Sequence, residues 1–196
     1  MKKLFLIILV TFISLAPVKA SHLMGGEITW TCITNPANGP VGLYIFTLKV
    51  YRDCNGIAIG GTTQTIIVHN NPLVPTINVD LIPGAPFDIS PLCDPVNSGN
   101  PQMDCLNPQQ GSIEEHVFES LPVNLPGLPP VGGWHFCWDG FARNNAILNL
   151  LNPGSLGMTL RAIMYPYTVT GVLQNTSPCY DSSPQFVEQP KTIICT

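Results

Sequence analysis

Three side chains that could hold a metal ion alternate along one predicted strand. His135, Cys137 and Asp139 fall at every second position of the segment 133–139, so they share one face of a strand. Imidazole, thiolate and carboxylate groups all bind transition metals. Such sites normally draw on a closer cluster of ligands, and the sequence has no Cys-x-x-Cys motif. We therefore interpret Cys137 as a disulfide cysteine beside a surface histidine and aspartate, and predict no metal or other cofactor.

Two short motifs resemble catalytic ones only in part. Pro153–Gly157 nearly matches a nucleophile elbow, but that motif begins with glycine and joins a parallel strand to a helix. Here a turn leads into a strand, so we interpret the segment as a turn. Glu114 and Glu115 are adjacent, so on a strand they face opposite ways and cannot flank one glycosidic bond. We predict that the protein is not an enzyme.

An aromatic row shares the strand with these histidine and cysteine residues. Trp134, Phe136 and Trp138 alternate with them and therefore point to the other face. Exposed, the row would be a platform for stacking sugars or for a protein contact. Buried, it would supply the central aromatic side chains of the core, which is the interpretation we favour. A carbohydrate-binding module that uses this face is the alternative function.

The elements that must position these residues are short strands separated by turns. Gly25–Gly26 predicts a flexible entry to the first of them. Leu43–Tyr51 is apolar on both faces, so we expect it to be central in a sheet. Strand patterns occur at Glu27–Ile33, Leu43–Tyr51, Thr62–His69, Thr76–Ile82, Ser112–Glu119, Gly133–Asp139 and Met158–Tyr165, with a further candidate at Val169–Leu173.

Long loops interrupt this series. Twelve of the twenty prolines lie between Pro72 and Pro130, and proline cannot donate a ladder hydrogen bond, so we expect edge strands and long loops there. The segment Arg143–Leu151 fits either a short helix or a strand. Together these features predict an all-β protein, an antiparallel β-sandwich that is Ig-like or jelly-roll-like, with proline-rich loops and disulfides. The sequence leaves the strand order open.

The N-terminus has the pattern of a secretory signal peptide. Lys2–Lys3 precede the apolar run Leu4–Leu15, and small residues end at Ala20, where we expect cleavage. Removing residues 1–20 takes three of the eight basic residues, so the mature chain has five against twelve acidic ones, a net charge of −7. This balance argues against a nucleic-acid partner. No second long apolar run occurs, so we predict a secreted or cell-surface protein without a membrane span.

The predicted organisation is one β domain, residues 21–174, followed by a different segment. Residues 175–196 begin as a polar linker and end with Phe186–Val187 and Thr192–Cys195, which resemble the opening strand of a next β domain. The chain would then be the front piece of a longer protein, with following domains. The alternative is that this segment folds back onto the same sheet and pairs Cys195 with Cys179 or Cys137.

The chain has seven cysteines, an odd number, which behind a signal peptide indicates disulfides and at least one unpaired thiol. Cys93–Cys105 is the pair we expect first, because a local bridge would fix a proline-rich loop that has few apolar residues. Cys32–Cys54 is disfavoured, because the two residues should lie at opposite ends of a hairpin, beyond the reach of a bridge.

Several motifs resemble one bacterial family. His22–Ile28, Tyr51–Cys54, Ile113–Glu115 and Arg143–Ile147 follow one another as in the N-terminal domain of Bacteroidota gliding-motility-associated, type IX-secreted adhesin-like surface proteins. Members often have two cysteines where this chain has Phe141–Ala142, so their bridging pattern need not apply. The resemblance implies a non-enzymatic extracellular module with a role near adhesion or gliding. It names no partner, so an extracellular protein and a glycan both stay open.

Four charged residues lie within or beside these motifs. Glu27, Arg52, Asp53 and Arg143 are among the few charges of the chain. We expect them to form an ion-pair and hydrogen-bond network at one end of a sheet, with Arg52 or Arg143 bidentate to a carboxylate. A ligand-binding cluster is the alternative interpretation.

Overall fold

The computed structural model describes residues 23–35, 39–91, 104–106, 111–166, 168–169 and 172–173. These residues are all-β, as predicted, and their one helical element is a 3-10 turn, η1 (Pro153–Ser155). The strands are β1 (Leu23–Asn35), β2 (Gly39–Asp53), β3 (Thr63–His69), β4 (Thr76–Leu81), β5 (Phe87–Asp88), β6 (Ile113–Ser120), β7 (Val123–Asn124), β8 (Trp134–Phe141), β9 (Gly157–Met164), β10 (Thr168–Val169) and β11 (Val172–Leu173).

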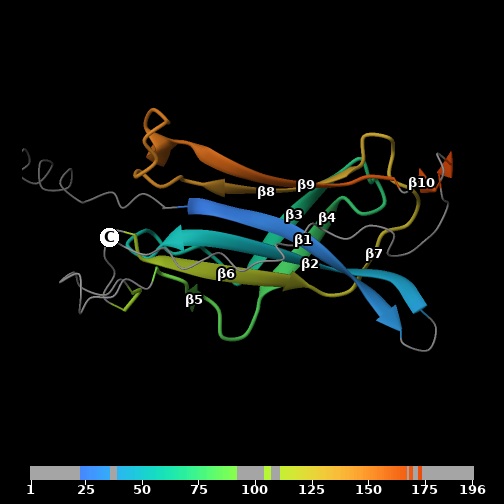
Figure 1. Ribbon diagram of the computed structural model, residues 1–196, viewed down its shortest axis with the longest axis horizontal. Coiled ribbons are helices and arrows are strands. Elements are labelled where there is room, and N and C mark those ends of the chain that lie inside the picture. The colour runs from blue at the N-terminus through green and yellow to red at the C-terminus, as the bar shows by residue number, and fades with distance from the viewer. Residues whose placement is uncertain are drawn as a thin grey trace, which may run out of the picture.

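One antiparallel sheet contains nearly all of these strands. Its order is β1-β2-β6-β4-β3-β8-β9, with β5 paired to β6 and β7 paired to β2, while β10 and β11 form a separate pair. In Figure 1, β8 and β9 lie above β1, β2 and β6, and β3 and β4 cross steeply between the two groups. The sheet therefore curls into a nearly closed, barrel-like shape around one core. Whether it is Ig-like or jelly-roll-like stays a prediction.

The two edges of the sheet meet where β1 begins. Leu23 donates its N–H to the carbonyl of Ala142 and accepts the N–H of Asn144, both at 3.0 Å. Further along, a Cβ at Gly26 would lie 2.6 Å from Leu160 of β9 and would also overlap a backbone carbonyl of β2. Gly26 is therefore required for close approach of β1 to its neighbours rather than for an unusual backbone angle, since its φ is not positive.

The core follows from period-two patterning in the central strands. Along β2, Phe46, Leu48 and Val50 are fully buried, while the residues between them are partly exposed. An aromatic cluster joins the two sides of the curled sheet: the ring centroids of Phe46 and Phe136 are 4.7 Å apart, and Trp30 lies 5.6 Å from Phe136. Burial of each such side chain contributes about 1.5–3 kcal/mol, so this cluster is the centre of the fold.

The structure corrects two expectations about the elements. Strands β4 and β6 are interior, because each pairs on both sides, although they lie in the proline-rich region where edge strands were expected. The prolines fall in the loops, and neither strand contains one. Residues 143–151 form neither helix nor strand but a loop of turns. The predicted centrality of β2, which pairs with β1 and β6, is confirmed.

Two predicted segments, the signal peptide at 1–20 and the segment 175–196, lie outside the described residues. No helix within the described part of the chain is long and apolar enough to cross a membrane.

Candidate functional site

A buried ion pair stands at the polar end of the core. Arg52 and Glu114 are register partners on β2 and β6, and both point inward. The Arg52 Nε and Nη2 atoms lie 2.6 and 2.5 Å from the same oxygen, Glu114 Oε1. Arg52 Nη1 donates to the carbonyl of Gly56 at 2.6 Å, and His116 Nε2 lies 2.6 Å from Glu114 Oε1. Every charge in this cluster is therefore hydrogen-bonded inside the protein.

The four-residue network predicted from the sequence does not form. Arg52 reaches a carboxylate, but it is that of Glu114 rather than of Glu27 or Asp53. Asp53 is buried and accepts hydrogen bonds from Asn144 Nδ2 at 3.1 Å and from the N–H of Asn55 at 2.9 Å. Arg143 Nε donates to the carbonyl of Gly157 at 2.8 Å. Arg52, Asp53 and Arg143 thus fix one end of the sheet by separate contacts.

Glu27 belongs to a different cluster, on the outer face of β1, β2 and β6. Lys49 Nζ lies 3.6 Å from Glu27 and 3.2 Å from Glu115. Burial opposes the charged form of Lys49, but the hydrogen bond and charge of Glu115 outweigh it and raise the pKa of Lys49. Burial also raises the pKa of Tyr51, and the two carboxylates add to that effect. As predicted, Glu114 and Glu115 face opposite ways, so they cannot act as a catalytic pair.

The disulfide at this end differs from the expected one. Cys105 bonds to Cys54, with the Cα atoms 5.4 Å apart, and not to Cys93, which lies outside the described residues. Proximity in the sequence favoured a local Cys93–Cys105 bridge, but the fold brings the segment 104–106 against the end of β2, where Cys54 follows. There Asp88 Oδ2 accepts the N–H of Cys105 at 2.7 Å. Cys32 lies near the loop end of the β1–β2 hairpin, as expected, and is also disulfide-bonded.

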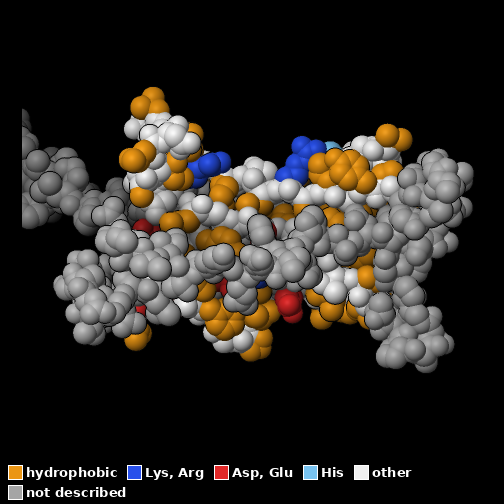
Figure 2. Space-filling model, in the orientation of Figure 1, with side chains coloured by type: hydrophobic (Ala, Val, Ile, Leu, Met, Phe, Trp, Pro, Cys, Tyr) orange, Lys and Arg blue, Asp and Glu red, His pale blue; other side chains and the backbone are white. Residues whose placement is uncertain are grey.

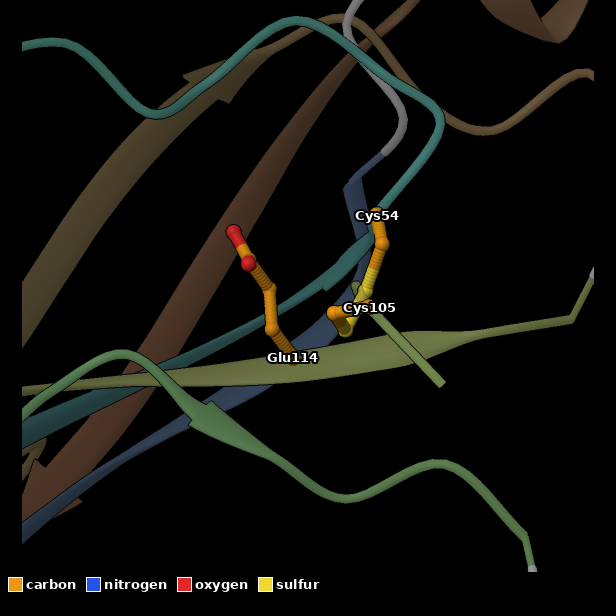
Figure 3. Close-up of side chains that lie close together, drawn as sticks. All are labelled: Cys54, Cys105 and Glu114. Atoms are coloured by element: carbon orange, nitrogen blue, oxygen red, sulfur yellow. A yellow bond between two sulfur atoms is a disulfide. The ribbon is translucent and has the colours of Figure 1, made fainter. Parts of the chain in front are cut away.

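The sulfur-containing clusters among the described residues do not form a metal site. The ligand atoms of Cys54, Cys105 and Glu114 lie within 4.8 Å of one another, and Figure 3 shows the glutamate on β6 beside the disulfide. Because the two sulfurs are bonded to each other, neither offers a thiolate. Cys137 is a free, buried thiol rather than the disulfide cysteine expected, and burial raises its pKa. His135, two residues before Cys137 on β8, has its Nδ1 atom 2.7 Å from Arg161 Nη2.

The aromatic row is part of the core. Trp134, Phe136 and Trp138 are all buried, and Phe136 packs in the central aromatic cluster. Their face is covered by the other side of the curled sheet, so it offers no platform for a glycan or a protein. The structure therefore removes the surface on which the carbohydrate-binding alternative depended.

A loop of residues 142–156 projects between β8 and β9, and its shape is fixed by asparagine side chains. Asn144 is buried, donates to Asp53 and accepts the N–H of Ala146 at 2.7 Å. Asn145 Oδ1 accepts the N–H of Gly154 at 2.9 Å, which joins the two sides of the loop. These bonds replace helix or strand hydrogen bonds, which explains why the apolar pattern of this segment was ambiguous.

The tip of this loop exposes leucines to solvent. Leu148 is 97% exposed and Leu151 is 87% exposed, and Phe141 and Leu156 at the base of the loop are also exposed. In Figure 2 hydrophobic side chains gather on the corresponding projection at the upper left. The sequence has no charged residue between Arg143 and Arg161. The structure thus places an uncharged, apolar tip on a fixed support.

A shallow hollow lies at the base of the same loop. It is bounded by Ile57 and Gln64 on one side and by Trp138, Asp139 and Phe141 on the other. The Trp138 indole N–H donates to Gln64 Oε1 at 3.1 Å. We use the term loop end for the region formed by residues 54–62, this hollow and the loop 142–156.

Only some of the residues that form or support the loop end were singled out as candidate site residues from the sequence. Arg52, Asp53 and Arg143 were singled out in the sequence and all help to support it. Glu114, His116, Asn144 and the exposed leucines were not assigned a role, and only the run of uncharged residues after Arg143 signalled the leucine tip.

Comparison of the chain with known protein families, with curated proteins and with solved structures found no match.

Proposed function

We propose that the chain is an exported, non-enzymatic binding module that attaches to an extracellular protein through its loop end. The observation that carries this proposal is the pair of leucines, Leu148 and Leu151, exposed at the tip of a loop whose shape is fixed by Asn144 and Asn145. The resemblance to front domains of gliding-associated, type IX-secreted adhesins supports the same function and a place at the cell surface.

Exposure of two leucines at one tip is costly in water. Full burial of a leucine side chain is worth about 1.5–3 kcal/mol relative to exposure, so a polar tip would suit a free loop better. An apolar tip on a fixed support loses little conformational freedom on binding, which favours a docking role. The absence of charge between Arg143 and Arg161 favours an apolar pocket on the partner over a charged surface.

The buried charged groups support a structural role rather than catalysis. Arg52 and Glu114 satisfy each other, and Asp53 is held by Asn144 and Asn55. Groups paired in this way are poorly placed to exchange protons with a substrate. The module thus consists of a supporting sheet and a displayed surface.

The proposal is tested with the oxidised chain of residues 21–196, labelled with a fluorophore. It is applied to immobilised extracellular matrix proteins and to intact bacterial cells, and in parallel to chromogenic glycoside, ester and peptide substrates. We expect saturable binding to at least one protein surface and no turnover. Two results contradict the proposal. One is turnover of a substrate that co-purifies with the chain, and the other is the absence of saturable binding to any of the surfaces.

A further inference from the structure

The two edge strands of the curled sheet, β1 and β9, separate beyond the loop end. Leu23 is hydrogen-bonded to residues 142 and 144, and Gly26 lies against Leu160. From there β1 and β9 diverge, as Figure 1 shows, and they do not pair with each other within the described part of the chain. Each of them therefore has a neighbour on one side only, β2 or β8, and presents an open edge on the other.

The open edge of β9 carries a row of backbone groups. The Val68 N–H bonds toward β4, so its neighbour Ile67 turns toward β8 and exchanges hydrogen bonds with Cys137. Arg161 is the register partner of Cys137 on β9. Because Cys137 turns its N–H and C=O groups toward β3, Arg161 turns its own away from β8, and so does Ile163 two residues on. Such a row is a template for a further strand.

The disulfide of Cys32 shows that another part of the chain reaches β1. Cys32 is disulfide-bonded, yet Cys54 and Cys105 bond to each other and Cys137 is a free thiol. The partner of Cys32 is therefore not among the described cysteines. The remaining cysteines of the sequence are Cys93, Cys179 and Cys195.

Cys93 is too far away to be this partner. The Ile89 N–H bonds to the first residue of β6, which pairs with Asp53 at the end of β2. Cys93 follows four residues later and can lie at most about 14 Å from Ile89. Cys32 pairs with Tyr44, which a strand rise of about 3.3 Å per residue places roughly 30 Å from Asp53. Since a bridge requires Cα atoms within about 7 Å, the partner of Cys32 lies in the segment after residue 173.

The direction of β9 favours Cys179 over Cys195. Like β1, β9 begins at the loop end, so the chain leaves it at the opposite end, where Cys32 lies. Cys179 is the first cysteine that follows. A bridge at Cys179 also leaves the β-branched run Thr192–Ile194 free to pair with an open edge, and Pro190, which cannot donate a ladder bond, precedes that run.

We propose that Cys32 is bridged to Cys179 and that residues 191–195 add as a strand to the open edge of β9, on the side that faces β1. The bridge holds this segment beside the edge at an effective concentration in the millimolar range, so it pairs there in preference to a second copy of the chain. The sheet is then closed by the chain itself. An edge covered in this way is protected from association with other strands, which leaves the loop end as the displayed surface.

This added strand is separate from the protein contact proposed for the leucine tip, and it is tested on the oxidised chain of residues 21–196. Non-reducing digestion and mass spectrometry should recover the peptides that contain Cys32 and Cys179 as one linked species. Cys32 linked to Cys93 or to Cys195, or recovered as a free thiol, overturns the proposed bridge.

Amide hydrogen exchange followed by NMR tests the strand itself. Arg161 and Ile163 should exchange at least about tenfold more slowly in the chain 21–196 than in a chain that ends at Asp181, which keeps both cysteines of the bridge. Leu160 and Ala162 are the matched controls, because their N–H groups point to β8. They should exchange equally in both chains, which also shows that β9 is folded.

Ile193→Pro in the chain 21–196 is the second variant, for the case that the shorter chain does not fold. Because proline cannot donate a ladder bond, this change should speed the exchange of Arg161 and Ile163 in the same way. Equal exchange rates of these two amides in the unaltered chain and in the folded variants overturn the added strand. Attachment through Leu148 and Leu151 is unaffected by either result, because both leucines lie at the loop end.

Discussion

Arg52 directs two of its guanidinium nitrogens at a single oxygen of Glu114, at 2.6 and 2.5 Å, inside the core. Removal of one partner leaves the other charge buried and unpaired, which typically costs about 3–5 kcal/mol. We therefore expect Arg52→Met and Glu114→Met each to lower the free energy of unfolding by about this amount, as measured by urea denaturation under oxidising conditions.

The double variant R52M/E114M should recover much of that loss, because no unpaired charge remains. Glu115→Gln is the matched control on the adjacent residue. Glu115 pairs with Lys49 on the outer face, so this change should cost only about 0–1 kcal/mol. Equal effects of Glu114→Met and Glu115→Gln would contradict a buried structural pair.

The Cys54–Cys105 bridge predicts a specific peptide map. Non-reducing digestion of the oxidised chain should release the peptides that contain these two cysteines as one linked species. Cys54→Ser/Cys105→Ser should lower stability by about 2–4 kcal/mol, the usual contribution of a native bridge. Recovery of Cys105 linked to Cys93 would instead support the local bridge expected from the sequence.

Asp88 should make this bridge region sensitive to acid. Partial burial works against the charged form, but hydrogen bonds from Ser90 Oγ and from the N–H groups of Cys105 and Ser90 hold the pKa of Asp88 below its ordinary 3.8. Because the folded-state pKa is depressed, the stabilisation is present above pH 3.8 and disappears as the pH falls through the lower folded value.

The Cys105 and Ser90 amide resonances should therefore shift below pH 3.8 in NMR spectra. Asp88→Asn should abolish that shift. A midpoint at or above 3.8 in the unaltered protein would argue against these hydrogen bonds.

Gly26→Ala tests how closely β1 approaches its neighbours. The added methyl group would overlap the carbonyl of Lys49 and lie 2.6 Å from Leu160, so we expect a loss of about 1–3 kcal/mol in urea denaturation. Gly25→Ala is the control, because its nearest atom lies at an ordinary 3.6 Å, on Tyr51. If both changes were tolerated equally, the edges of the sheet would have to lie further apart.

Local patterning predicted the strands well, because alternation along β2, β8 and β9 is a property of neighbouring residues. Pairings between distant segments were less accessible. The sequence showed Arg52 and Glu114 as isolated charges, since only the β2–β6 register makes them partners. Likewise, Cys54 meets Cys105 through the position of β6, which spacing along the chain does not reveal. The loop 142–156 was ambiguous because asparagine side chains, rather than backbone periodicity, determine its shape.

We propose that the leucine tip of the loop end, Leu148 and Leu151, makes the protein contact. Its most direct test is attachment of the double variant Leu148→Ser/Leu151→Ser to the protein surface that the unaltered module binds. Both residues are exposed, so thermal stability should be unchanged. The matched control is Leu73→Ser/Leu121→Ser, which alters two exposed leucines at the opposite end of the sheet. We predict at least a tenfold loss of affinity for the tip variant and none for the control. Full attachment by the tip variant, or an equal loss in the control, would show that the leucine tip does not make the protein contact.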